Sequence, residues 1–373
     1  MLKTINDKLT TILYKLPGSV VFILSVLLVI IIGTCDYLTG EEVTLYLFYV
    51  LPVFIACWRL GLWQGFAISI FSLLFWYVDS FYQRPEFGNL ILSPYWNIVF
   101  QFIFFVVLVL ILTSLKKSVE REKKAEREKI ENELKVARDV QQKLFPQAMP
   151  AMQGLEYFGL CIPADEIGGD YFDYIKLSSD EIGFAIGDIS GHGLPSALLM
   201  AGLVGFVRSN ALICRDDLKQ LLYRVNNLMC ESTTPGKFAT FFYGVYNCAE
   251  KVFRYVNAGH NPPFVFRKNN NSNELLKGGG LMIGVMPEFG YSEMQIRIEK
   301  GDVLVLYTDG ITEAFDKNSY LYGEERLKTV VENNLHLSAK ELCGVITKDV
   351  FQYSEGRKQA DDMTLLVVRC ITD

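Results

Sequence analysis

The distribution of charge along the chain constrains its fold more than any other feature. Residues 18–115 carry only seven charged side chains: Asp36, Glu41, Glu42, Arg59, Asp79, Arg84 and Glu86. Most of the other charged residues follow position 115, although 50% of all 373 residues are hydrophobic. This division argues against a chain that is soluble throughout, against a disordered chain and against a disulfide-framed secreted domain. It predicts a membrane part followed by a polar part.

Four apolar segments lie near residues 18–35, 43–60, 62–79 and 96–115. Each has about the length that a helix needs to cross a bilayer. The second contains Pro52, which a membrane helix can accommodate as a kink. We therefore expect residues 1–115 to form a four-helix transmembrane sensor or anchor.

The charges that flank these segments predict their orientation. Lysines lie before the first segment and after the last, whereas acidic residues follow the first segment: Lys3, Lys8, Lys15, Lys116 and Lys117 against Asp36, Glu41 and Glu42. By the positive-inside rule, both termini are expected in the cytoplasm. The predicted location is the inner or plasma membrane of a cell, with several crossings.

Residues 116–146 form a densely charged linker with nothing before Pro146 that breaks a helix. Its apolar positions recur at alternating spacings of four and three: Ile130, Leu134, Ala137, Gln141 and Leu144. This spacing is typical of a coiled-coil seam and predicts a homodimer through the linker. A single solvent-exposed helix is the alternative. The Lys-rich start of the linker could also contact anionic membrane lipid.

Residues 147–373 show a mixed pattern. Strands are expected at Glu181–Gly187, Ala239–Tyr246, Val252–Ala258, Pro263–Arg267, Asp302–Tyr307 and Met363–Arg369. Helices are expected at Pro195–Ala211, Asp216–Ser232, Gly323–Asn334 and Ser338–Ser354. Several strands follow one another directly, which favours an α+β fold with helices packed on antiparallel sheets. The acidic excess of this part makes it an unsuitable general binder of nucleic acid.

Four aspartates in this part stand in turns at the ends of apolar runs. They are Asp170, Asp188, Asp309 and Asp361, each within a short motif that is also rich in Gly or a second acid. One Asp-Gly turn alone would be an ordinary turn. Four in succession suggest carboxylates that converge above a sheet, where a cation would have to offset their repulsion. Ligand sets made only of oxygen suit Mg²⁺ or Mn²⁺.

The stretch from about residue 136 to residue 369 resembles the SpoIIE/RsbU-type branch of the PPM, or protein phosphatase 2C-like, serine/threonine phosphatases. The matching segments are ARDVQQKLFP (137–146), PADEIGGDYFD (163–173), GDISGHG (187–193), NAGHNPP (257–263), YTDGITEA (307–314) and DDMT (361–364). The resemblance covers essentially the whole polar half, in the same order. The N-terminal half is similar, more weakly, to four-span input modules of bacterial signalling enzymes.

The resemblance implies a PPM β-sandwich flanked by helices, with a site for two divalent cations, Mn²⁺ or Mg²⁺. Asp188 would bridge the two metals and the backbone carbonyl of Ile189 would be a further ligand. Asp309 and Asp361 would bind one metal. Asp170 would lie beside the cluster and bind a metal directly or through water. These positions would make Asp170, Asp188, Asp309 and Asp361 the catalytic residues.

The activity implied is hydrolysis of phosphoserine or phosphothreonine by water that the metals activate. The implied substrate is a phosphorylated STAS-type antagonist of an anti-sigma factor, within a partner-switching pathway. The alternative is a non-catalytic membrane receptor that uses this domain only to bind partners. We also expect that movement of the linker realigns the helix that begins at Pro195.

Three other interpretations of these motifs are weaker. Residues 168–172 resemble the GGDEF signature of diguanylate cyclases, but Tyr171 replaces its fourth-position acid. Asp188, Ser190 and His192 lie within five residues, so they cannot readily form a hydrolase triad. His260 is expected to be part of a structural turn rather than a general acid.

Overall fold

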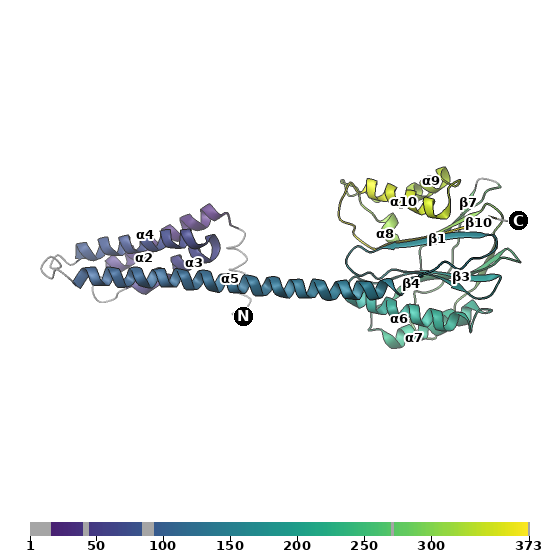
Figure 1. Ribbon diagram of the computed structural model, residues 1–373, viewed down its shortest axis with the longest axis horizontal. Helices are drawn as coiled ribbons and strands as arrows, with labels where there is room; N and C mark the ends of the chain where they lie inside the picture. The colour runs from purple at the N-terminus through teal and green to yellow at the C-terminus, as the bar shows by residue number, and fades with distance from the viewer. Residues whose placement is uncertain (1–15, 40–44, 84–92, 270–271, 372–373) are drawn as a thin grey trace. The chain divides into compact units, whose positions relative to one another are not determined.

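The computed structural model describes residues 16–39, 45–83, 93–269 and 272–371 (Figure 1). The chain divides into two compact units, Met1–Ile130 and Glu131–Asp373. Helix α5 (Ser93–Gln142) begins in the first unit and ends in the second.

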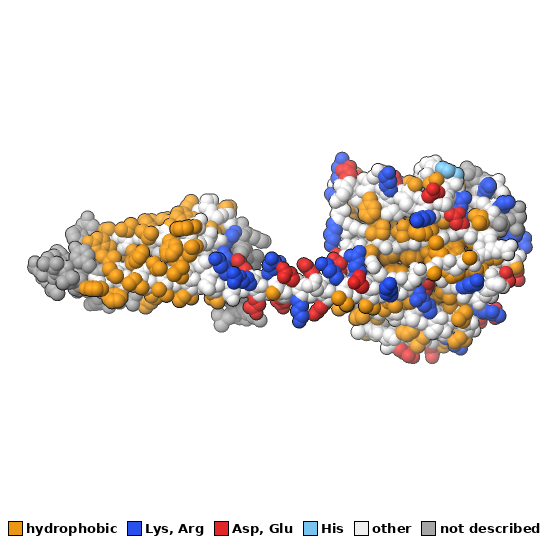
Figure 2. Space-filling model, viewed as in Figure 1, with side chains coloured by type: hydrophobic (Ala, Val, Ile, Leu, Met, Phe, Trp, Pro, Cys, Tyr) orange, Lys and Arg blue, Asp and Glu red, His pale blue; other side chains and the backbone are white. Residues whose placement is uncertain are grey.

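The first unit is built from apolar helices. These are α2 (Gly18–Thr39), the 3-10 helix η2 (Tyr46–Tyr49), α3 (Val50–Leu60), α4 (Leu62–Gln83) and the first part of α5. Residues of all four α-helices share one hydrophobic cluster, which contains Val29, Val53, Ile68 and Val109. Hydrophobic side chains also cover much of the surface of these helices that Figure 2 shows. An apolar exterior of this kind suits a lipid environment.

Two helices in this unit are long and apolar enough to cross a membrane, α2 and the part of α5 from Ile98. The apolar stretches Leu47–Leu60 and Leu62–Val78 are shorter. The four-span arrangement therefore stays a prediction. The flanking charges Lys3, Lys8, Lys15, Glu41 and Glu42, together with the start of the predicted second span, lie outside the described residues.

A third helix of suitable length and composition is Leu194–Ala211, in the second unit. One face of this helix, with Met200, Leu203 and Val207, is completely buried in the hydrophobic core of that unit. Its apolar character is therefore explained by packing against a sheet.

Helix α5 continues from the apolar segment into the charged linker without a break. It ends at Gln142 rather than at Pro146, and the following residues form a tighter turn in which the N–H of Leu144 donates to the carbonyl of Gln141. Two positions of the proposed coiled-coil seam contact their own chain: Gln141 is buried, and Leu144 packs on the core of the second unit. In this arrangement the seam is restricted to Ile130, Leu134 and Ala137.

The second unit contains two five-stranded sheets in which all neighbouring strands are antiparallel. The first has the order β1 (Leu155–Ile162), β10 (Met363–Cys370), β9 (Val303–Tyr307), β6 (Phe264–Phe266) and β7 (Asn273–Leu275). The second has the order β2 (Tyr171–Lys176), β3 (Glu181–Ile189), β4 (Ala239–Asn247), β5 (Val252–Ala258) and β8 (Met294–Arg297).

Helices cover the outer face of each sheet (Figure 1). Helices α6 (Leu194–Ala211) and α7 (Leu218–Ser232) pack on the second sheet, and α9 (Glu324–Asn333) and α10 (Ala339–Tyr353) pack on the first. The short helix α8 (Asp309–Thr312) follows β9. The predicted α+β sandwich flanked by helices is confirmed.

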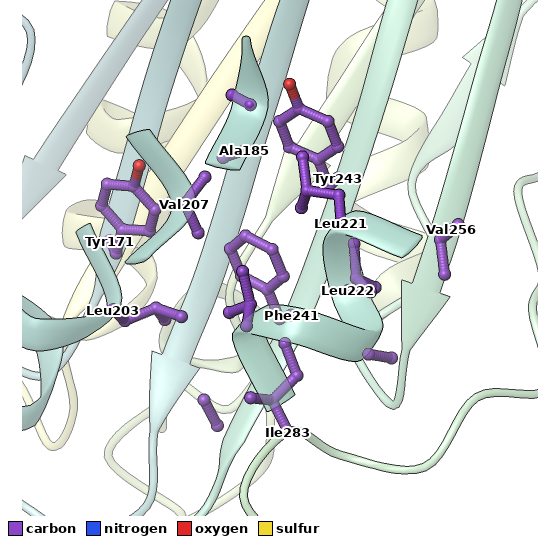
Figure 3. Packing of buried hydrophobic residues seen from close by; sticks show 14 of the residues in the cluster. Tyr171, Ala185, Leu203, Val207, Leu221, Leu222, Phe241, Tyr243, Val256 and Ile283 are labelled. Carbon is purple, nitrogen blue, oxygen red and sulfur yellow. The ribbon is translucent and has the colours of Figure 1, made fainter. Parts of the chain in front are cut away.

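Alternation along the strands explains this layering, because successive side chains of a strand point to opposite faces. In β3, Phe184 and Ile186 lie in the cluster between the two sheets, whereas Ala185 lies in the cluster under α6 and α7. Figure 3 shows Ala185 in that second cluster with Leu203 of α6 and Leu221 of α7. Both faces of the central strands are buried, which accounts for their continuous apolar runs.

Candidate metal centre

The strand register brings all four predicted aspartates to one end of the sandwich. Asp170 directly precedes β2, and Asp188 lies near the end of β3, where Gly187 pairs with Tyr171. Asp309 directly follows Thr308 at the end of β9, and Asp361 precedes β10, where Leu365 pairs with Tyr307. Each sheet therefore contributes two aspartates at the ends of its strands.

A hydrogen bond between side chains joins the two sheets at this end. The hydroxyl of Thr308 donates to a carboxylate oxygen of Asp170 over 2.7 Å, and the N–H of Thr364 donates to the same hydroxyl over 2.9 Å. Asp170 is only 2% exposed, whereas Asp361 is exposed to solvent. Asp170 is therefore the deepest of the four carboxylates and Asp361 the most accessible.

Asp362, the residue after Asp361, holds the turn that precedes β2 through hydrogen bonds to its backbone. The carboxylate of buried Asp362 accepts hydrogen bonds from the backbone N–H groups of Ala164 (2.8 Å), Gly169 (2.7 Å) and Asp170 (3.4 Å). A side chain on Gly168 would overlap this carboxylate, which explains why glycine occupies that position. The two adjacent aspartates therefore have different surroundings: Asp362 faces the backbone and Asp361 faces solvent.

The carboxylates lie close enough to oppose one another's ionisation. Burial, followed by repulsion from Asp309, Asp361, Asp362 and Glu313, raises the pKa of Asp188 to about 7. Burial and the charges of Asp361 and Glu313 also raise the pKa of Asp309. Among the described residues, no ion pair of a Lys or Arg involves Asp188, Asp309 or Asp361.

This donor set fits a hard divalent cation, because it consists of carboxylate oxygens whose mutual repulsion is not offset by an ion pair with any Lys or Arg that the structure describes. The side chains do not form a closed ligand cage: no three His, Cys, Asp or Glu residues in the described part of the chain are arranged to hold a metal ion. The assignment of Asp170, Asp188, Asp309 and Asp361 as metal ligands therefore stays a prediction.

Ile189 has the surroundings expected of a residue that would bind a metal only through its backbone carbonyl. Its side chain is buried in the core under α6 and α7. A β-carbon on Gly169 would stand 3.0 Å from the Ile189 carbonyl oxygen. Glycine at 169 thus lets the turn approach this carbonyl closely.

The end of helix α5 contacts the same turn. The amide of Gln141 donates to the carbonyl of Gly168 over 2.7 Å and accepts from the N–H of Gly168 over 3.1 Å. Arg138 forms an ion pair with Glu166 at 3.1 Å. A second connection runs to α6, where Arg208 donates to the carbonyl of Leu144 over 2.6 Å. The linker therefore contacts both the turn before Asp170 and the helix after Asp188.

The two histidines near this end differ in their surroundings. His192 is exposed in the loop between β3 and α6. His260 is buried, with its Nδ1 2.9 Å from the hydroxyl of Thr240, and burial lowers its pKa to about 4. A neutral and inaccessible imidazole is suited to a structural turn rather than to acid catalysis at neutral pH.

The sequence motifs gave no role at this centre to four residues that shape it: Gln141, which was placed in the coiled-coil seam, and Thr308, Glu313 and Asp362. Each lies inside a matched motif, so its presence was visible in the sequence. Their contacts were not visible, because the bonds made by Gln141 and Asp362 connect segments that are 27 and 198 residues apart.

Comparisons with known proteins identify the families that the two parts of the chain match. The family profile described as Stage II sporulation protein E (SpoIIE) matches residues 178–371, and a domain of unknown function, DUF4118, matches residues 18–129. The chain is 29% identical over 242 residues to phosphoserine phosphatase RsbU of Bacillus subtilis, which covers 65% of this chain and 71% of that protein.

Protein IcfG of Synechocystis sp. is 27% identical over 267 residues, which is 63% of this chain and only 41% of that protein. Among solved structures, the SiaA-PP2C domain of Pseudomonas aeruginosa matches with a TM-score of 0.58 and 20% identity, over 66% of this chain and 98% of that domain. At this identity the likeness shows the fold, which is that of the protein phosphatase 2C-like enzymes.

Proposed function

This chain belongs to the family of Stage II sporulation protein E, and on that premise we propose that it is a metal-dependent protein phosphatase that hydrolyses phosphoserine or phosphothreonine. The observation that carries the proposal is the convergence of Asp188, Asp309, Asp361 and Asp170 at one end of the sandwich. The relative RsbU, named a phosphoserine phosphatase, supports the substrate chemistry.

In this proposal, two Mn²⁺ or Mg²⁺ ions are held by Asp188, the Ile189 carbonyl, Asp309 and Asp361. When bound, such ions activate water for attack on phosphorus and neutralise charge on the phosphoryl oxygens. The chain's own residues fix the geometry: Thr308 orients the Asp170 carboxylate, and Asp362 holds the backbone before it. Buried positions of this kind keep the carboxylates in place as charge changes during the reaction.

Metal removal tests this function. Treatment of the purified full-length protein with EDTA is expected to abolish hydrolysis of p-nitrophenyl phosphate and of a phosphoserine peptide, and added Mn²⁺ or Mg²⁺ is expected to restore both. Release of inorganic phosphate is the measurement. Hydrolysis that continues unchanged in EDTA would rule out the metal mechanism.

We also propose that the physiological substrate is a phosphorylated STAS-type antagonist of an anti-sigma factor. The match of residues 178–371 to the SpoIIE profile and the similarity to RsbU over 242 residues support this partner. Candidate antagonists encoded near this gene, prepared in phosphorylated form, are the substrates with which to test it.

The first unit is proposed to place the enzyme in the membrane with several crossings and with both termini in the cytoplasm. Its apolar helices and the DUF4118 match support a membrane location. Dimerisation through the linker is proposed only for the part of α5 before Gln141, since Gln141 and Leu144 contact their own catalytic unit.

The contact between the linker and the metal end predicts a regulatory effect. Replacement Gln141→Leu keeps the size of the side chain but leaves the buried backbone groups of Gly168 without partners. Since a displacement of about 1 Å in a catalytic group can reduce the rate about 100-fold, we expect kcat of the full-length protein to fall between about 10- and 100-fold. Exposed Gln142 offers the matched control, Gln142→Leu, which should retain its kcat. Equal rates in the two variants would contradict a role for the linker.

A further inference from the structure

A small hollow lies beside the proposed metal centre. It has a volume of about 200 Å³ and is formed by the turn after α8, the end of α10, the loop that follows α10 and the start of β10. Asp361 lines it, and so does Gly310, the residue after Asp309. Two of the proposed metal-binding positions are therefore at or next to the wall of this hollow.

The lining of the hollow combines apolar and charged residues, Glu313 among the latter, and two aromatic side chains on it are accessible to solvent. Phe315 is 40% exposed and Phe351 is 46% exposed, whereas Val350 and Met363 beneath them are buried. Large apolar side chains grouped around a depression at the surface are typical of a site that another molecule covers.

Two consecutive cations, Arg357 and Lys358, line the rim of the hollow. The guanidinium of Arg357 donates to the carbonyl of Lys317 over 2.7 Å, which fixes the loop. Lys358 pairs with Asp165 at 2.7 Å, but the side chains are 77% and 56% exposed, and water and salt screen an exposed pair of this kind so strongly that it contributes little to stability. The Lys358 ammonium can therefore turn toward an incoming phosphate at little cost.

We propose that this hollow is a specificity subsite that receives one large aliphatic side chain of the phosphoprotein substrate, near its phosphorylated residue. The proposal rests on the proposed phosphatase function. A volume of about 200 Å³ is smaller than the roughly 300–1,000 Å³ of small-molecule pockets, which favours a single side chain as the occupant. The rim cations complement the phosphate-bearing segment of the same substrate.

A second, shallow depression supports a macromolecular substrate. It follows α10 toward Leu160 of β1 and includes Thr347 and Lys348. Phe351 lines both depressions, so the apolar surface is continuous from the metal end along α10. A free phosphomonoester would use none of this surface, whereas a protein substrate could cover it.

Matched phosphoserine peptides test the subsite in the full-length protein in mild detergent with Mn²⁺. The two peptides of each pair differ only by leucine or alanine at one position, and the pairs vary that position through the four residues on either side of the phosphoserine. One position is expected to give about a tenfold higher kcat/KM for leucine, since burying one aliphatic group in a pocket commonly has an effect of this size. Hydrolysis of p-nitrophenyl phosphate, which lacks neighbouring side chains, reports on the metal centre alone.

Variants at Phe351 connect that preference to the hollow. In Phe351→Ala the ratio of kcat/KM for the leucine peptide to kcat/KM for the alanine peptide is expected to fall to near one. Phe351→Leu is expected to restore most of the leucine preference. Ile371→Ala is the control, because Ile371 is 49% exposed and follows the opposite end of β10 from Met363. Lys358→Gln should lower kcat/KM for both peptides of a pair and reduce its dependence on salt.

The outcomes separate the two proposals. If p-nitrophenyl phosphate is hydrolysed but no position shows a leucine preference, the subsite proposal is contradicted and the phosphatase proposal is not. The same conclusion follows if the leucine preference is retained in Phe351→Ala. If no probe is hydrolysed with Mn²⁺ or Mg²⁺, both proposals fall.

Discussion

Replacement Asp188→Asn is expected to lower phosphatase turnover by about 10³-fold or more, which corresponds to about 4 kcal/mol of lost transition-state stabilisation. The reason is that Asp188 lies where burial and repulsion from Asp309, Asp361, Asp362 and Glu313 act on one carboxylate, as expected of a residue that bridges two cations. Asparagine has nearly the same shape but cannot supply the negative charge that two cations share. Phosphate release from a phosphoserine peptide measures the loss.

The same substitution is expected to leave the fold intact. A neutral side chain removes the repulsion at this end, so the protein stripped of metal should unfold at the same temperature or a higher one. Asp180→Asn is the control, since Asp180 is exposed in the turn that leads into the opposite end of β3. Turnover of Asp188→Asn within tenfold of the wild type would contradict the bridging role.

The second large effect is expected when the adjacent residues Asp361 and Asp362 are replaced one at a time, because the two replacements should differ in their effect on stability. Asp361→Ala is expected to lose activity and keep its stability, because Asp361 is exposed. Asp362→Ala is expected to lose both, because it removes the acceptor of three backbone N–H groups. Leaving a buried N–H group unsatisfied costs about 1–3 kcal/mol. Because Ala164 is only partly buried and the bond to Asp170 is long at 3.4 Å, we expect a total near the lower end, about 3 kcal/mol.

For a unit of this size, a loss of about 3 kcal/mol lowers the unfolding temperature by about 6–12 °C. Scanning calorimetry of the full-length proteins gives this value, and phosphate release gives the activity. Equal unfolding temperatures for the two variants would show that the contacts of Asp362 do not stabilise the turn before β2.

Local patterns were sufficient to predict the central strands. Val252–Ala258 was predicted with its observed bounds. The strands that begin at Glu181, Ala239 and Met363 continue only one or two residues beyond their predicted ends. These strands are apolar on both faces because they lie between a second sheet and a helical layer. Their continuous apolar runs are bounded by Gly, Asp and Asn, which makes the ends visible in the sequence.

Strands at the edges of the sheets were not predicted. Leu155–Ile162 lies at one edge and includes Gly159, and Asn273–Leu275 and Met294–Arg297 are short and largely exposed. Such segments are strands only because a neighbour pairs with them, which a local pattern does not reveal. Tyr171–Lys176 is also an edge strand, and it was missed for a further reason: its buried polar residue Asp173, which pairs with Arg208 at 2.6 Å, interrupts the apolar pattern.

The sequence was sufficient to select the candidate acids, and their role as metal ligands stays a prediction. Asp170, Asp188, Asp309 and Asp361 were selected from motif and order, and the antiparallel register explains how they come together. The motifs could not show which of their residues would bind metal and which would hold the backbone in place. The roles of Asp362 in holding the turn and of Gln141 in joining it to the linker depend on contacts across the fold.

The central claim is that these aspartates hold two divalent cations that the phosphatase reaction requires. The most direct measurement is a titration of metal-stripped full-length protein with Mn²⁺, in which bound metal and phosphate release are followed together. We predict two Mn²⁺ per chain, with activity rising as they bind, and loss of both binding and activity in Asp188→Asn. Activity without bound metal, or unchanged Mn²⁺ binding in Asp188→Asn, would contradict this account.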